Sequence, residues 1–195
     1  MKPKQDPDVQ LMLAVQRDDE EAFETLFRKY IGQVVRFAFS FVGSRARAEE
    51  LAQDAFVHLL STRRRYQPRA RFSTFLFRIV TNLCLSEVRR AEHRVTVRYT
   101  PRADANDMTP DAVANMPDRG GRTGEEDLLV REQIDKMRES LRRLPPQQRA
   151  AILLARVEGF SYEEVARSLR CSVAAVKSLI HRATVTLRDQ LREVR

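Results

Sequence analysis

Apolar residues recur at intervals of three and four from Phe23 to Val42, and this spacing is typical of one long amphipathic helix. Gly43 ends the stripe, as glycine commonly does after a helix. Ser44 and Ser73 can each cap a further helix with the same apolar period, and a shorter helix over residues 8–17 precedes the stripe. Strand-like alternation and hairpin turn signals do not interrupt this pattern. The sequence therefore predicts an all-α fold.

The segment 96–125 breaks the helical pattern. Its prolines and glycines leave little apolar period, so it cannot bury enough surface to order itself. A structureless loop of about thirty residues inside one compact domain is improbable. We therefore predict two small helical domains, residues 1–95 and 126–195, joined by a flexible linker. The residues that indicate the linker are Pro101, Pro110, Pro117, Gly120, Gly121 and Gly124.

The second domain contains two short amphipathic helices around a tight turn, in the stretch GFSYEEVARSLRCSVAAVKSLIHRA, residues 159–183. Ser161 and Glu164 form a capping box at the start of the first helix, because each side chain can satisfy an unpaired backbone N–H. Ser172 can cap the second helix. This is the arrangement of a helix-turn-helix, which places its second helix in the major groove of DNA. An ordinary helical hairpin with a solvated outer face fits the same pattern.

The outer face of that second helix carries small, polar and basic residues, which suit close approach to base edges and phosphates. We expect Ser178, His181 and Arg182 to read bases, while Lys177 holds the DNA backbone together with Arg149 and Tyr162. The full set of DNA contacts expected in this domain is Arg149, Tyr162, Ser172, Ala174, Ala175, Lys177, Ser178, His181 and Arg182.

Basic residues in the first domain also point to nucleic acid. The net charge of +8 favours a polyanionic partner. Between Arg63 and Arg94 there are nine arginines and two acidic residues, and Tyr66 and Phe72 interrupt the arginines. Arginines interleaved with aromatic rings suit single-stranded DNA, whose bases stack on rings while arginines follow the phosphates. Either ring can instead be a core residue, and for Phe72, directly before Ser73, the two roles fit equally well.

The N-terminal residues lack the apolar segment of a signal peptide, and the longest apolar runs are shorter than the roughly 18 residues of a membrane span. We therefore expect a cytoplasmic protein without membrane insertion. Cys84 and Cys171 each fall where a helix requires a small apolar residue, which indicates buried free thiols. His58, His93 and His181 are scattered and form no metal-binding pattern. No metal or other cofactor is expected.

Two long segments resemble a known family. AEELAQDAFVHLL and RRRYQPRARFSTFLFRIVTNLCLSEVRR are similar to region 2 of the extracytoplasmic-function (ECF) sigma factors of bacterial RNA polymerase. LRRLPPQQRAAILLARVEGFSYEEVARSLRCSVAAVKSLIHRATVTLRDQL is similar to their region 4, and the resemblance covers residues 8–94 and 127–192. It implies a specificity subunit that binds core RNA polymerase (its β′ and β subunits), recognises promoter DNA and performs no covalent chemistry. An anti-sigma factor is a common partner in this family.

The resemblance also assigns surfaces. Region 4 would read the −35 promoter element. On the helix that follows Ser44, the polymerase-binding residues would be Glu49, Glu50, Gln53 and Asp54, which meet the coiled coil of the β′ subunit; the residues alone fit a solvated acidic face as well. The contacts implied at the −10 element are Arg63, Arg64, Arg65, Tyr66, Arg71, Phe72, Ser73, Thr74, Arg78 and Asn82, with Arg89, Arg90 and Arg94 on nearby phosphates.

Two other classes of protein share part of this pattern. A regulator of the response-regulator or repressor type also carries a helix-turn-helix, but it would need a sensor or dimerisation domain where residues 1–95 predict only helices. A nucleic-acid-processing enzyme would need a catalytic constellation. The sequence shows no paired carboxylates, nucleophile–base set or phosphate-cradling glycine loop, so an enzyme is not expected.

Overall fold

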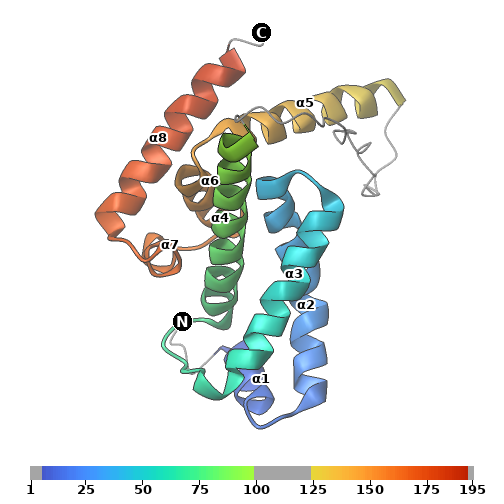
Figure 1. Ribbon diagram of the computed structural model, residues 1–195, viewed down its shortest axis with the longest axis vertical. Helices are drawn as coiled ribbons and strands as arrows, with labels where there is room; N and C mark the ends of the chain where they lie inside the picture. The colour runs from blue at the N-terminus through green and yellow to red at the C-terminus, as the bar shows by residue number, and fades with distance from the viewer. Residues whose placement is uncertain (1–5, 99–123, 193–195) are drawn as a thin grey trace.

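The computed structural model describes residues 6–98 and 124–192, and every regular element in these ranges is helical (Figure 1). The all-α prediction is confirmed. Most of the predicted linker lies outside the described residues. The first unit comprises α1 (Pro7–Val15), α2 (Glu20–Val42), α3 (Arg45–Thr62), a 3₁₀ turn (Arg63–Arg65) and α4 (Phe72–Arg98); the second unit comprises α5 (Gly124–Arg143), α6 (Pro146–Ile152), a π-helical turn (Leu153–Val157), α7 (Tyr162–Leu169) and α8 (Val173–Arg192).

The junction between α2 and α3 is built as the sequence predicts. Gly43 has φ of 71°, a left-handed conformation that glycine adopts without steric cost, and it ends α2. Ser44 then caps α3, since its hydroxyl oxygen accepts a hydrogen bond from the Arg47 amide at 3.4 Å. The two helices pack as an antiparallel pair along the first unit (Figure 1).

The start of α4 differs from the prediction. The helix begins at Phe72, one residue before the predicted cap, Ser73. The carboxylate of Asp6 accepts a hydrogen bond from the Phe72 amide at 3.0 Å, and its other oxygen accepts one from the Asp8 amide at 3.2 Å. One buried carboxylate therefore caps both α1 and α4. Residue spacing near position 73 could not reveal a cap that lies 66 residues away in the sequence.

Helix α4 lies at the centre of the molecule, with α2 and α3 on one side and α6 and α7 on the other (Figure 1). Buried apolar residues from both units form one continuous cluster, and a second, smaller cluster in the second unit consists of Leu144, Ile152, Ala183 and Leu187. Phe77 of α4 meets Phe160, just before α7, edge to face, with 5.5 Å between ring centroids. The two units are thus packed together through a shared apolar contact.

The chain between α5 and α7 changes its helical type in one turn. Pro146 opens α6, which ends at Ile152 and continues as the π-helical turn. The Glu158 amide reaches back five residues to the Leu153 carbonyl, at 3.1 Å. This wider turn buries Leu153 and Leu154 together and leaves Val157 68% exposed.

Candidate nucleic-acid interface

Helices α7 and α8 form the predicted helix-turn-helix. The Ser161 hydroxyl oxygen accepts a hydrogen bond from the Glu164 amide at 3.3 Å, and the Glu164 carboxylate accepts one from the Ser161 amide at 2.9 Å, which completes the capping box. Arg170 turns the chain with φ of 54°, and the Ser172 hydroxyl oxygen accepts from the Ala175 amide at 3.1 Å. Both predicted caps are confirmed.

The open face of α8 carries most of the residues that the sequence assigns to DNA contact in this helix. Its opposite face, with Val176, Ile180, Ala183 and Leu187, is buried against the second unit. Figure 1 shows α8 at the outer edge of the molecule, away from α2 and α3. Ser172, Ala174, Lys177, His181 and Arg182 are exposed, while Ala175, Ser178 and the nearby Tyr162 are half-buried.

Arg149 does not belong to this open face. It is 5% exposed, and its guanidinium donates hydrogen bonds to the carbonyls of Phe41 and Leu144, each at 3.1 Å, and to that of Arg142. The guanidinium also lies over the Phe41 ring. The predicted contact of Arg149 with the DNA backbone is corrected: in this arrangement it joins the two units, because Phe41 belongs to α2.

Three residues predicted to contact the −10 element are buried. Phe72 is fully buried and packs edge to face on Tyr30, with 5.3 Å between ring centroids, so it is a core residue and does not receive a base. Tyr66 is 5% exposed, and its ring packs on Phe75. Thr74 is 3% exposed because α7 covers it. Sequence spacing could not reveal the burial of Thr74, since α7 follows α4 by more than sixty residues in the chain.

The contact that covers Thr74 is polar. Its hydroxyl donates a hydrogen bond to one carboxylate oxygen of Glu164 at 3.3 Å, and Arg71 lies 3.7 Å from the same oxygen. The other oxygen of Glu164 is the one that completes the capping box. One buried carboxylate thus supports the helix-turn-helix and also holds α7 against the first unit.

Several of the predicted DNA-binding arginines form ion pairs with carboxylates of the first unit. Asp18 pairs with Arg63, whose Nε lies 2.8 Å away, and with Arg64 at 3.5 Å. The Arg63 guanidinium lowers the pKa of the Asp18 carboxyl. These two arginines therefore tie the end of α3 to the turn between α1 and α2, and each would have to leave Asp18 to contact DNA.

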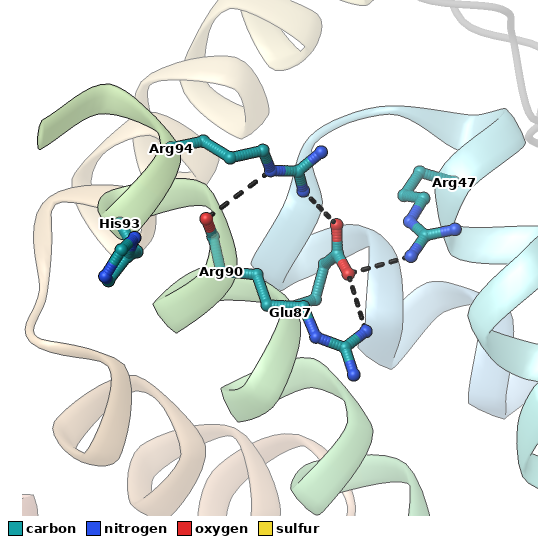
Figure 2. A pocket seen from close by; sticks show the side chains of 5 residues that line it. All are labelled: Arg47, Glu87, Arg90, His93 and Arg94. Carbon is teal, nitrogen blue, oxygen red and sulfur yellow. Dashed lines mark hydrogen bonds and ion pairs between the residues drawn. The ribbon is translucent and has the colours of Figure 1, made fainter. Parts of the chain in front are cut away.

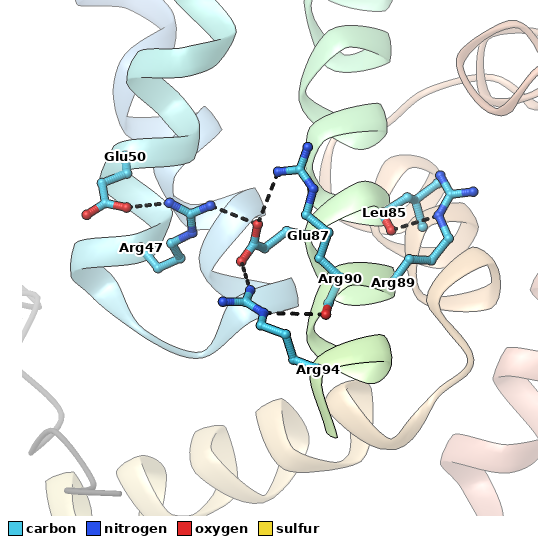
Figure 3. Close-up of polar contacts among 7 residues, drawn as sticks. All are labelled: Arg47, Glu50, Leu85, Glu87, Arg89, Arg90 and Arg94. Atoms are coloured by element: carbon cyan, nitrogen blue, oxygen red, sulfur yellow. Dashed lines mark hydrogen bonds and ion pairs between the residues drawn. The ribbon is translucent and has the colours of Figure 1, made fainter. Parts of the chain in front are cut away.

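Glu87 forms ion pairs with two more of these arginines. Figure 3 shows its carboxylate between Arg47 of α3, at 2.8 Å, and Arg94 and Arg90 of α4, at 3.2 and 3.9 Å. These side chains and His93 surround a cavity of about 450 Å³ (Figure 2). Hydrogen bonding from Arg47, followed by the charges of Arg47 and its neighbours, lowers the pKa of Glu87. The arrangement holds α3 and α4 together and partly neutralises the basic end of α4.

Other arginines of the predicted −10 site carry no carboxylate partner in the part of the chain that the structure describes. Arg89 is exposed and donates a hydrogen bond to the Leu85 carbonyl, at 3.2 Å (Figure 3). Arg65 and Arg78, with the exposed Asn82, line a cavity of about 780 Å³ beside α4. The second unit contributes Arg167 and Arg170 to the wall of this cavity. Sequence analysis missed these two arginines because no local pattern places them opposite α4.

The predicted polymerase-binding surface lies on the exposed side of α3. Glu49, Glu50, Gln53 and Asp54 are all exposed, with Glu49 paired to Arg45 and Glu50 to Arg47. Val57, one turn further along α3, is 65% exposed. Sequence analysis did not include Val57, because a single exposed apolar residue is common on protein surfaces and gives no signal by itself.

Cys84 is fully buried, as predicted, and burial raises the pKa of its thiol to about 12. Cys171 is only half-buried, so the prediction holds for one of the two thiols. Within residues 6–98 and 124–192, no group of three or more potential ligands could hold a metal ion. None of the helices in those ranges combines the length and apolar character that crossing a membrane requires.

Known proteins match both units. The model of Sigma-70 region 2 matches residues 26–94, and that of Sigma-70, region 4 matches residues 134–187. The ECF RNA polymerase sigma factor SigE of Mycolicibacterium smegmatis is 33% identical over 174 residues, which are 87% of this chain and 62% of that relative. The RNA polymerase sigma-H factor of Pseudomonas aeruginosa is 30% identical over 182 residues, 92% of this chain and 91% of the relative.

A solved structure shares the fold. The sigma factor RpoE of Bartonella quintana, solved in complex with the anti-sigma factor NepR, superposes with a TM-score of 0.67 at 24% identity, covering 89% of this chain and 98% of that one. The two family matches and the sequence relatives together define the class of protein: the chain belongs to the ECF group of the sigma-70 family.

Membership of this family defines the general function. The chain is an RNA polymerase sigma factor, which binds core polymerase and promoter DNA and directs transcription initiation. The alternative of a regulator with a sensor domain is set aside, because residues 26–94 match Sigma-70 region 2.

Proposed function

We propose that the chain is an alternative sigma factor in which α3 binds core polymerase, the first unit reads and melts the −10 element, and α8 reads the −35 element. The observation that carries this assignment is the open face of α8 behind a helix-turn-helix whose caps are complete. The remainder of the chain supplies binding surfaces, and no reaction step is assigned to it.

The described arrangement is closed, and promoter recognition requires it to open. The −10 and −35 elements are separated by about 25 base pairs, or about 85 Å of straight duplex at 3.4 Å per base pair. Helices α7 and α8 comprise 8 and 20 residues, and the three residues between them add little. Even laid in line they would reach only about 55 Å from the Thr74–Glu164 contact. The two units must therefore separate before both elements can be bound together.

Opening would change which groups face the −10 element. Thr74 and Arg71 would lose Glu164 and become available, beside Arg65, Arg78 and Asn82, which line the adjacent cavity already. Guanidinium groups follow phosphates, and amide and hydroxyl groups read base edges. We assign this group of five residues to the −10 element.

The polymerase-binding surface is assigned to Gln53, Asp54 and Val57. Gln53 and Asp54 are exposed polar groups, and Val57 supplies the apolar contact that a protein–protein interface normally has at its centre. Glu49 and Glu50 lie at the border and are paired to arginines of the same helix. We also infer that an anti-sigma factor regulates the protein, as one binds the Bartonella relative.

The test is in-vitro transcription from a promoter library with purified core polymerase, in the presence and absence of this chain. Promoter-specific transcripts that depend on the chain support the proposal. A chain that binds promoters by itself and leaves polymerase specificity unchanged would overturn it.

The polymerase surface is tested separately by a Gln53→Ala, Asp54→Lys double variant, which should weaken core binding about tenfold or more in a pull-down titration. A Gln147→Ala, Asp189→Lys variant makes the same two changes on exposed positions of the second unit and serves as the matched control. Equal affinity of both variants would remove α3 from the assignment.

A further inference from the structure

The cavity of about 780 Å³ lies between the two units. Arg65, Arg69 and Arg78 come from the first unit, and Arg167 and Arg170 come from the second. Its volume is in the range of small-molecule sites, about 300–1,000 Å³. Because α4 and α7 supply its facing walls, the complete cavity exists only while the units are packed together.

The charged residues that line this cavity are all arginines, and the nearby Glu163, which lies outside the lining, interacts electrostatically with Arg167. None of the cavity's five arginines forms an ion pair within residues 6–98 and 124–192, whereas Arg63, Arg64, Arg71, Arg90 and Arg94 all do. No aspartate or glutamate is among the residues that line it. Five guanidinium groups around one space repel each other, and an anion between them would relieve that repulsion.

The cavity wall also has an aromatic surface. Tyr66 is among the residues that line it, but its hydroxyl is buried and is therefore not counted as a donor to a ligand. The Phe75 ring lies next to the Tyr66 ring and carries the Arg78 guanidinium at 5.5 Å from its centroid.

We propose that the closed chain binds a small polyphosphate in this cavity, namely the di- or triphosphate group of a free nucleotide, and that this ligand holds the two units together. Guanidinium groups bind phosphate oxygens through paired, charge-assisted hydrogen bonds, and the five arginines come from both walls. The inference rests on the proposed function, because Arg65 and Arg78 are also assigned to the −10 element. Ligand and promoter would therefore compete for the same groups.

A free nucleotide fits this cavity better than a DNA strand. Promoter binding requires the separated units, and separation removes Arg167 and Arg170 from the site. A small ligand instead contacts both walls at once and so binds the closed state selectively. A ligand with such a preference shifts the equilibrium between the two states by its differential affinity.

The experiment is calorimetric titration of the full chain with GTP, inorganic pyrophosphate and guanosine. We expect GTP and pyrophosphate to bind and guanosine not to bind, with an accompanying rise in Tm. Tighter binding of GTP than of pyrophosphate would identify a nucleotide as the source of the phosphates, and equal binding would assign recognition to the polyphosphate alone. An Arg167→Gln, Arg170→Gln variant should bind about tenfold more weakly.

The matched control is an Arg156→Gln, Arg188→Gln variant, which removes two exposed charges of the second unit away from the cavity. Its affinity for GTP should stay within about twofold of that of the unchanged chain, since the two charges that are lost lie away from the cavity. Equal weakening in both variants would show unspecific attraction of polyanions and overturn the proposal. Binding of a single-stranded −10 oligonucleotide through Arg167 and Arg170, without GTP binding, would overturn it as well.

The polyphosphate proposal and the proposed function can be refuted independently of each other. Arg167 and Arg170 are outside the surfaces assigned to polymerase and promoter, so their variant should direct transcription normally. A chain that directs transcription but binds no polyphosphate refutes this inference alone. A chain that binds polyphosphate but never directs transcription refutes the proposed function alone.

Discussion

The two surfaces proposed to read DNA are in opposite states. Helix α8 presents Lys177, His181 and Arg182 to solvent, and its buried face packs on its own unit. The −10 surface on α4 is partly covered by α7, which buries Thr74 and engages Arg71. The proposed −35 surface is thus exposed in the closed chain, whereas the proposed −10 surface becomes fully exposed only when the units separate.

This difference follows from how each surface is built. The face of α8 depends on local features, a capping box and a turn, which form wherever that segment folds. The surface on α4 also serves as the packing site for the other unit, so its exposure depends on a tertiary contact. A surface of the second kind can be regulated by that contact, and a surface of the first kind cannot.

The largest expected effect concerns the core beneath the −10 surface. Phe72→Ala should lower the free energy of unfolding by about 3–5 kcal/mol, because it removes a fully buried ring that packs on Tyr30. Chemical denaturation would measure this loss. Phe72→Leu keeps most of the volume and should retain both folding and promoter opening. A stable Phe72→Leu protein that fails to open promoters would restore the base-capturing role that burial argues against.

On the open surface, Arg182→Ala should cost about 1–3 kcal/mol of binding at one promoter position and relax the preference there. Lys177→Ala should instead weaken all sites alike, since a phosphate contact carries no sequence information. Binding-site selection with the holoenzyme measures both effects. If the two variants lose affinity with unchanged sequence preference, Arg182 is not a base reader.

The contact between the surfaces is tested by Glu164→Gln. This change keeps a capping-box side chain but removes the charge that faces Arg71. The equilibrium between the closed and open states should therefore shift about tenfold towards the open state, which corresponds to about 1.4 kcal/mol. Distance measurements between labels on the two units would report the change. Glu163→Gln, an exposed neighbour on the same helix, is the control and should leave the distance distribution unchanged. An equally closed Glu164→Gln protein would show that apolar packing alone keeps the units together.

The sequence sufficed for features that depend on neighbouring residues. Apolar periods predicted the helices, and Ser44, Ser161 and Ser172 were identified as caps because their partners lie three residues away. Features that join distant segments were not predictable in this way. Asp6 caps α4 from 66 residues away, and Glu164 reaches Thr74 across 90 residues. The buried state of Thr74 and the two-unit cavity follow from such contacts.

A smaller effect is expected from Glu87, which joins α3 to α4. Its folded-state pKa lies below the ordinary value near 4.5, mainly because Arg47 donates a hydrogen bond to it. Its stabilising contribution is therefore present above about pH 4.5 and is lost as the pH falls through the folded-state pKa. Glu87→Gln should cost about 1 kcal/mol at pH 7 and progressively less towards pH 3, measured as the difference in unfolding free energy. A difference that stays constant with pH would mean that Glu87 acts through packing and not through its charge.

The smallest effect separates the arginines at the end of α4. Arg89 has no carboxylate partner among the residues that the structure describes, whereas Arg94 lies 3.2 Å from Glu87 (Figure 3). If DNA phosphates reach this end of α4 in the open state, Arg89→Gln should weaken promoter binding severalfold at every sequence and lower the salt slope by about one. Arg94→Gln should change the slope less, because Arg94 must first leave Glu87 and its charge is already partly neutralised. The measurement is holoenzyme affinity at several salt concentrations. Equal slopes for Arg89→Gln and the unchanged chain would mean that Arg89 contacts no phosphate. DNA contacts in the first unit would then be limited to the groups beside α7, so the departure of α7 would be the step that exposes the proposed −10 surface.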